Sequence, residues 1–137
     1  VNSYIIKNIE KIDLQNTSSF HLPSLFDHQD EVKFGQDLFN NILNNNEELK
    51  NHLIGRTPNW DSDRIAKIDY AILITSIAEL LYFPSIPPKV TINEYIEIAK
   101  EFSSPSSGKF INGVIDNLIR DLTEKGLIVK TGRGLIS

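Results

Sequence analysis

Apolar residues recur at steps of three and four along most of the chain, and this spacing predicts helices. Residues 3–12 place their apolar positions on one face of a helix, and a polar, proline-containing loop follows to residue 30. From Glu31 to about Leu53 the spacing predicts one amphipathic helix. Its apolar positions are Val32, Phe34, Leu38, Phe39, Ile42, Leu43, Leu49 and Leu53.

The segment from Ile68 to Phe83 is apolar on almost every side, which predicts the buried central helix of the domain. The break "GRTPNW" stands before it, and Asn59 is placed to cap a short helix that runs to Ile65. Three prolines in "FPSIPP" end the central helix.

A capping box predicts where the next helix begins. Thr91 is followed three residues later by Glu94, so each side chain can accept from an orphan backbone N–H at the helix start. Val90 and Tyr95 occupy the two positions of a hydrophobic staple. The apolar stripe of this helix then continues to Phe102.

The stretch "SSPSSGKFINGVID", residues 103–116, raises the question of a phosphate-binding loop. A P-loop needs a glycine five residues before its Gly-Lys pair and a Ser or Thr after it. Here a serine stands five residues before Gly108, and Phe110 follows Lys109. The sequence therefore excludes a P-loop.

A helix from residue 105 to about residue 125 is the preferred interpretation of the same region. Asn-Gly favours a hairpin, but the apolar residues beyond it keep helical spacing. Ser104 is predicted as N-cap, with Pro105 at the first helical position. Gly113 then lies mid-helix at a cost of about 1 kcal/mol relative to alanine, which predicts that another helix crosses closely there.

The last twelve residues read differently from the rest of the chain. Gly126 is suited to end the helix. Ile128 and Val129 favour a strand, and "TGRG" favours a turn, so a small hairpin and a loose tail both remain open.

Composition narrows the class of protein. The chain has 137 residues, of which 40% are hydrophobic, so it is long and apolar enough for one folded domain. It has no cysteine, and its three histidines lack metal-ligand spacing, so we expect no disulfide, metal or cofactor. No apolar run reaches the ~18 residues of a membrane span. No catalytic triad or carboxylate pair is visible. We expect a cytoplasmic protein that is not an enzyme.

Charge leaves nucleic-acid binding open. The net charge is −4, yet from Lys125 onward there are three basic residues and no acid. One alternative is a winged-helix DNA-binding module, with a recognition helix and a basic wing within residues 105–136. The outer face of that helix would present Asn112, Asp116, Asn117, Arg120 and Asp121, and its aspartates would repel phosphate.

Residues 56–119 closely resemble the C-terminal part of the NusB family of bacterial transcription antitermination factors. The resemblance rests on a Trp-x3-Arg pair, "IDYAILITSIAELL", a proline turn, "KVTINEYIEIAK", a small polar loop and "KFINGVID". The same domain also precedes some RNA cytosine methyltransferases, but no methyltransferase sequence follows here, so we do not expect that variant.

The resemblance implies an all-α fold of two packed helical subdomains. It divides the chain into a partial N-terminal helix and loop (1–30), the NusB-like helical domain (31–122) and a basic extension (123–137). The implied function is binding of boxA RNA in ribosomal RNA leaders together with NusE, within the transcription elongation complex. Where the family opens with an arginine-rich helix, this chain has only Lys7 and Lys11. A helical protein-interaction module without RNA binding is therefore the second alternative.

The resemblance also suggests site residues. Lys109 and Phe110 match a Lys-Phe pair close to bound RNA, and Ser106 and Ser107 stand at a helix start, where backbone N–H groups can meet a phosphate. Asp69 matches a carboxylate near the NusE-binding surface. Each residue also has a purely structural interpretation: a core position for Phe110, solvation for Lys109, capping for the serines and a favourable helix-dipole position for Asp69.

Overall fold

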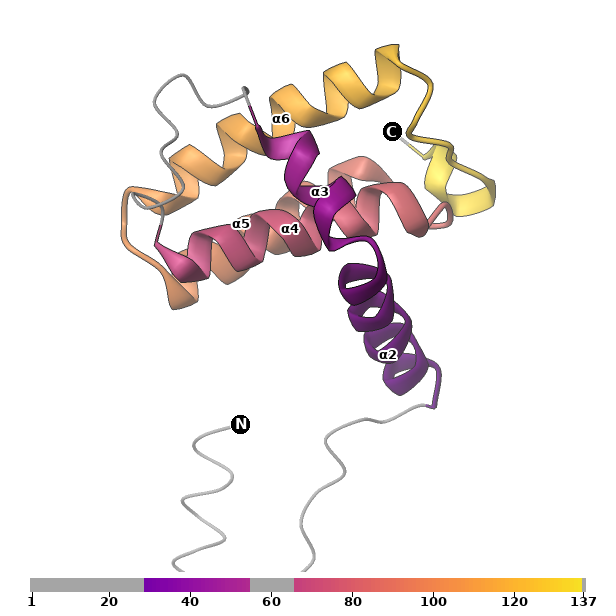
Figure 1. The fold of residues 1–137 in the computed structure, drawn as a ribbon, viewed down its shortest axis with the longest axis horizontal. Helices are drawn as coiled ribbons and strands as arrows, with labels where there is room; N and C mark the ends of the chain where they lie inside the picture. Colours follow the sequence, from indigo (N-terminus) through magenta and orange to yellow (C-terminus); the bar gives the residue numbers. More distant parts are fainter. Residues whose placement is uncertain (1–28, 55–65, 137) are drawn as a thin grey trace, which may run out of the picture. The chain divides into compact units, whose positions relative to one another are not determined.

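The computed structural model describes residues 29–54 and 66–136, and the chain divides into two units, residues 1–32 and 33–137. The described residues form helices and no strand, which confirms the all-α prediction for them (Figure 1). The helices predicted over residues 3–12 and 59–65 lie outside the described residues. The elements are α2 (Gln29–Asn44), α3 (Asn46–Leu53), α4 (Lys67–Tyr82), α5 (Pro88–Phe102), α6 (Ser107–Glu124) and the 3-10 helix η2 (Gly132–Leu135).

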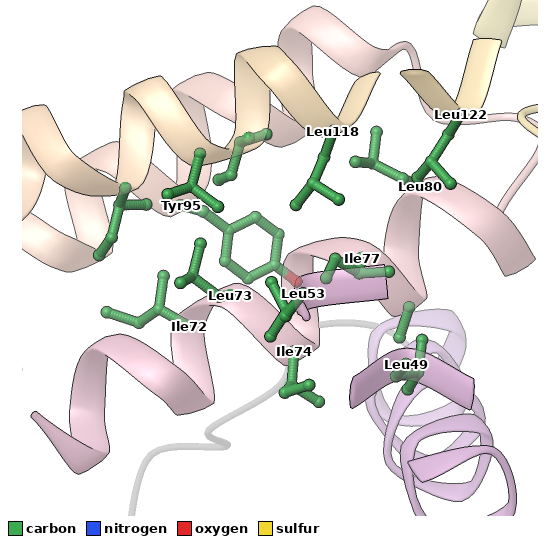
Figure 2. Packing of buried hydrophobic residues seen from close by; sticks show 14 of the residues in the cluster. Leu49, Leu53, Ile72, Leu73, Ile74, Ile77, Leu80, Tyr95, Leu118 and Leu122 are labelled. Atoms are coloured by element: carbon green, nitrogen blue, oxygen red, sulfur yellow. The ribbon is translucent and has the colours of Figure 1, made fainter. Parts of the chain in front are cut away.

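Helix α4 is the central helix, as its sequence predicts. It contacts α3, α5 and α6, and most of its residues from Ile72 to Leu80 are buried. Figure 2 shows α3 side chains packed beside α4, and the ring of Tyr95 from α5 in the same cluster. Each fully buried Leu or Ile contributes about 1.5–3 kcal/mol. The core comprises Leu49, Leu53, Ile72, Leu73, Ile74, Ile77, Ala78, Leu80, Tyr95, Ala99, Ile111, Val114, Ile115, Leu118 and Leu122.

The helix predicted from Glu31 to Leu53 is in fact two helices, separated at Asn45. Asn45 has φ −119° and ψ 20°, outside the helical region, and its Nδ2 donates to the Asn41 carbonyl at 2.9 Å. Helix α2 has no buried residue, whereas α3 buries Leu49 and Leu53. Helix α3 packs its apolar residues into the core on α4, whereas α2 reaches the core only through the partly buried Leu38 and Ile42.

The predicted start of α5 is wrong by four residues, because the N-cap is Pro87 and not Thr91. The helix begins at Pro88, and Thr91 lies inside it, fully buried, with its hydroxyl donating to the Pro87 carbonyl at 3.5 Å. Val90 is 45% exposed, so it forms no hydrophobic staple. Proline suits the first helical position because that residue needs no N–H donor. The capping-box pattern at Thr91 and Glu94 was therefore a coincidence of spacing.

Helix α6 also departs from its predicted boundaries. Its N-cap is Ser106, two residues later than the predicted Ser104, and no side chain caps it. Gly113 is exposed, and an added Cβ there would meet nothing within 4 Å. The predicted helix crossing at Gly113 is therefore wrong, and no tertiary contact explains this glycine.

Gly126 ends α6, as predicted. Its φ is 67°, and its N–H donates to the Thr123 carbonyl at 2.9 Å. The N–H of Leu127 donates to the Leu122 carbonyl, also at 2.9 Å. The reversed φ that this bond pattern needs is cheap only for glycine.

Neither the hairpin nor the loose tail is found after Gly126. The Lys130 ammonium donates to the Phe83 carbonyl at 3.1 Å, and the Thr131 N–H donates to the Pro84 carbonyl at 2.9 Å. Gly134 is packed so closely that an added Cβ would lie 2.0 Å from the Pro84 oxygen. The end of α4 has carbonyls without an intrahelical partner and the negative end of the helix dipole, and both favour donors such as those of the tail.

Neither a membrane-spanning helix nor a cluster of metal ligands is found among the described residues. None of the helices in residues 29–54 and 66–136 is long and apolar enough to cross a membrane. Within the same ranges, no group of three or more His, Cys, Asp or Glu side chains could hold a metal ion.

Candidate nucleic-acid interface

Asp69 lies in the first turn of α4 and is only 7% exposed. Its two carboxylate oxygens accept from different serines: Oδ2 from the Ser107 hydroxyl at 2.7 Å, and Oδ1 from the Ser103 hydroxyl. The position near the N-terminus of α4 favours a negative charge. Hydrogen bonds from two hydroxyls compensate for much of the lost hydration of the buried carboxylate.

A chain of serines continues from Asp69 towards the surface. The hydroxyl oxygens of Ser103 and Ser107 lie 2.9 Å apart, and that of Ser104 lies 2.7 Å from Ser107 and 3.0 Å from Ser106. Since Ser103 follows α5, Ser107 opens α6 and Asp69 opens α4, this cluster joins the ends of three helices. We call these five residues the Asp69–serine cluster.

The exposed part of this region is the first turn of α6. Ser106 and Lys109 are both exposed, and no side chain caps the helix. Helix N-termini present backbone N–H groups and a positive dipole end, which together suit a phosphate. Lys100 lies next to this turn, with its Cγ 3.8 Å from the place of a Cβ on Gly108. Lys109 and the helix start thus face solvent, while the Lys100 ammonium donates to Glu97.

The predicted RNA-contacting residues divide into two pairs. Ser106 and Lys109 are at the surface, whereas Ser107 is 4% exposed and bound to Asp69. Phe110 is half-buried and packs against the hydrophobic core. The structure therefore leaves two of the four residues available to a ligand without rearrangement, and part of the Phe110 ring.

Asp69 was predicted near a partner surface, and its contact with Ser107 was not predicted. Two large apolar residues beside the cluster in sequence are exposed: Ile68 at 41% and Phe102 at 62%. Sequence reasoning missed Ser103 altogether. Its hydroxyl matters only because the ends of α4 and α5 meet, and a serine after a helix carries no signal of that.

The winged-helix alternative lacks its wing. Residues 127–131 form no strand, and the tail ends in the 3-10 helix η2. On the outer face of α6, Asn112 donates to Asp116 at 3.2 Å and Arg120 donates to Asn117 at 3.4 Å. The polar side chains expected to contact bases therefore contact one another.

A second buried polar pair was not foreseen from the sequence. The Tyr95 hydroxyl donates to Glu79 Oε2 at 3.0 Å, and Glu79 is 6% exposed. Burial raises the pKa of Tyr95 well above its usual value, and the Glu79 charge raises it further. Burial lowers the pKa of Lys130, while its attraction to Glu79 acts in the opposite direction. The Tyr95–Glu79 pair links α4 to α5 and shares no residue with the Asp69–serine cluster.

Comparison with known proteins extends the resemblance seen in the sequence. A profile of the NusB family matches residues 4–120. Transcription antitermination protein NusB of Salinibacter ruber is 47% identical over 103 residues, 75% of this chain and 64% of that protein. The protein of the same name from Chloroherpeton thalassium is 40% identical over 99 residues, 72% of this chain and 47% of that protein.

A third relative and a solved structure agree with these matches. Transcription antitermination protein NusB of Geotalea daltonii is 41% identical over 103 residues, 75% of this chain and 71% of that protein. The structure of NusB from T. maritima superposes with a TM-score of 0.67 and 26% identity, covering 86% of this chain and 82% of that one. The chain thus spans 64% and 47% of the lengths of the first two relatives.

Proposed function

The chain belongs to the NusB family, and from this premise we propose that it is a transcription antitermination factor that binds RNA. The observation that carries the proposal is the family match over residues 4–120, together with relatives that bear the name transcription antitermination protein. The proposal includes no catalytic step.

We further propose that the RNA is the boxA element of ribosomal RNA leaders and that NusE is the protein partner, in the cytoplasm and within the transcription elongation complex. The first turn of α6 supports RNA contact, because Ser106 and Lys109 are exposed at an uncapped helix start. Backbone N–H groups and the Lys109 ammonium would bind phosphate. The exposed part of the Phe110 ring would meet an unpaired base.

In this proposal Asp69 affects the partner surface through its position. It is nearly buried and is bound by Ser103 and Ser107, so it fixes how the starts of α4 and α6 meet. The exposed apolar side chains of Ile68 and Phe102 would then make the direct contacts with NusE.

Replacing Lys109 by alanine tests the RNA contact. We expect weaker binding to boxA RNA and to unrelated single strands alike. The dependence of the binding constant on salt concentration should also become weaker, by the amount expected for about one lost phosphate contact. Titrations at two salt concentrations measure both quantities. Lys89→Ala is the matched control, since Lys89 is also an exposed lysine near a helix start. Equal RNA binding by parent and Lys109→Ala would exclude this contact.

Phe110→Ala separates RNA binding from the second candidate function, a helical interaction module without RNA binding. Phe110 is half-buried and packs against the hydrophobic core, which favours that alternative. Loss of a base stack would weaken RNA binding by ~1–3 kcal/mol. If Phe110 serves only the core, the variant should lose up to ~3–5 kcal/mol of folding stability and melt at a lower temperature. Undetectable binding of boxA RNA by the parent chain would favour the module outright.

A further inference from the structure

We infer that residues 127–136 form a docking surface for an extended, acidic segment of a partner protein, which pairs with residues 127–131 as an added strand. This stretch, which we call the tail surface, lies beyond residues 4–120, the part that matches the NusB family. The inference therefore goes beyond the proposed function and does not depend on RNA binding.

The tail surface exposes four large apolar side chains within ten residues. Leu127 is 46% exposed, Val129 62%, Leu135 70% and Ile136 65%. All four are aliphatic, whereas unpaired bases stack on aromatic side chains. Aliphatic side chains along an exposed edge instead suit contact with the side chains of a partner strand. The chemistry of these residues therefore favours a protein ligand over RNA.

Side-chain burial along the tail has the period of a strand. Exposed and half-buried residues alternate from Leu127 to Thr131: Leu127, Val129 and Thr131 are exposed, and Ile128 and Lys130 are half-buried. This is the two-residue period of extended backbone. Thr131 itself has φ −137° and ψ 154°, which are strand values.

One backbone edge of this segment is already used, and the other is used only in part. The N–H groups of Leu127 and Thr131 donate to backbone oxygens of the same protein, each at 2.9 Å. Residues an even number apart in extended backbone share an edge, so the opposite edge carries the N–H and carbonyl groups of Ile128 and Lys130. The Ile128 N–H donates to the Leu122 carbonyl at 3.4 Å, which leaves the Lys130 N–H and the two carbonyls. Among the described residues, no backbone group pairs with these three. Such an edge is a template for strand addition.

The tail surface is held in place before any partner arrives. The Lys130 ammonium bonds to the Phe83 carbonyl, and Gly134 packs against Pro84. A ligand that docks on a pre-ordered segment does not have to order it, so more of the interaction energy appears as affinity.

Charge identifies the kind of partner. All acidic residues of the chain precede residue 125, and Lys125, Lys130 and Arg133 follow. Lys125 pairs with Asp121 at 3.0 Å, and half-buried Lys130 donates to the Phe83 carbonyl, so exposed Arg133 supplies the accessible positive charge of the tail surface. A second copy of the tail would bring the same positive charges to the edge, which opposes tail-to-tail pairing. An acidic extended segment brings the complementary charge.

The first test titrates the full chain, labelled with 15N, with an end-blocked octapeptide of alternating glutamate and valine. We expect amide shift changes that concentrate in residues 127–136. The same peptide with lysine in place of glutamate should bind at least about tenfold more weakly, because opposite charges directly apposed attract and like charges repel. No shift changes at millimolar peptide, or equal binding of the two peptides, would overturn the inference.

The second test distinguishes strand pairing from side-chain contact alone. Two further glutamate–valine peptides carry N-methyl groups on alternate residues, one on each edge. Only the peptide methylated on the pairing edge should lose binding, because it has lost its donors. Equal loss or equal retention of binding in the two peptides would refute strand addition.

Matched protein variants locate the site. Val129→Asp should weaken the glutamate–valine peptide by about tenfold, since it removes an apolar contact and adds a like charge. Phe39→Asp should not, although Phe39 is equally exposed at 61%. Thermal melts should show both variants folded. Dimerisation of the parent that Val129→Asp abolishes would instead make the tail surface a self-interface, and salt-sensitive shifts with oligouridylate but not with the peptide would make it an RNA arm; either result overturns the inference.

Discussion

A nearly buried carboxylate at the start of α4, Asp69, is stabilised by hydroxyl groups that the chain supplies from 34 and 38 residues away. Similarly, Glu79 is served by the Tyr95 hydroxyl, 16 residues away. In both cases the charge is tolerated because donors from another helix replace its lost hydration. The hydrogen bonds of Asp69 and Glu79 fix the position of α4 relative to α5 and α6, whereas the apolar contacts of the core are not directional.

The Tyr95–Glu79 pair predicts a pH dependence. In the folded chain the pKa of Tyr95 is raised, so its hydroxyl stays protonated, while in the unfolded chain it titrates at its usual value of 10.0. The folded state therefore binds more protons above that pH, and stability falls as pH rises. Between about pH 9 and about pH 11 this loss amounts to about 1.4 kcal/mol.

The variant Tyr95→Phe lacks the titrating hydroxyl, so its stability should not show this loss at high pH. At neutral pH the variant should be less stable by ~1–3 kcal/mol, because Glu79 loses its buried donor. The gap between parent and variant should then narrow by about 1.4 kcal/mol between about pH 9 and about pH 11. Urea unfolding at the two pH values measures this. A constant gap would show that Tyr95 is not held protonated by the fold.

At the level of the helix, two glycines should respond to alanine with opposite signs. Gly113 is exposed in the middle of α6 with nothing within 4 Å of an added Cβ, so Gly113→Ala should stabilise by about 0.5–1 kcal/mol. A Cβ added at Gly134 would lie 2.0 Å from the Pro84 oxygen, so Gly134→Ala should destabilise by about 1–3 kcal/mol. Melting of the two variants checks both signs. Stabilisation by Gly134→Ala would show that the tail is not packed on the α4–α5 turn.

For the molecule as a whole, removal of the tail separates stability from partner binding. A chain that ends after Leu122 loses the anchors at Phe83 and Pro84 and the half-buried Ile128, so it should melt at lower temperature. It should still associate with NusE, under the proposed function, because the residues proposed for that contact lie in α4 and α5. Pull-down with purified NusE, alongside circular dichroism of the truncated chain, tests this. Loss of association with the helical spectrum intact would contradict the proposed contact surface.

For the described residues, the sequence alone determined which segments form α-helices and which helix is buried. Helical periodicity marked α4 and α6, and Gly126 marked the end of α6, because these signals depend on local spacing and on backbone freedom. The family resemblance over residues 56–119 likewise came from local strings, and it indicated the fold that the structure shows.

Only the tertiary structure decided the helix boundaries, the path of the tail and the partners of the buried polar groups. Thr91 matched a capping box but lies inside α5, since Pro88 offers an earlier start and the core takes up the threonine. Asn45 breaks a continuous apolar stripe because α3 must turn to pack on α4. Ser103 meets Asp69, and Lys130 meets Phe83, across separations of 34 and 47 residues. Such contacts have no local signature, because the positions of distant helices, rather than the spacing of neighbours, bring the groups together.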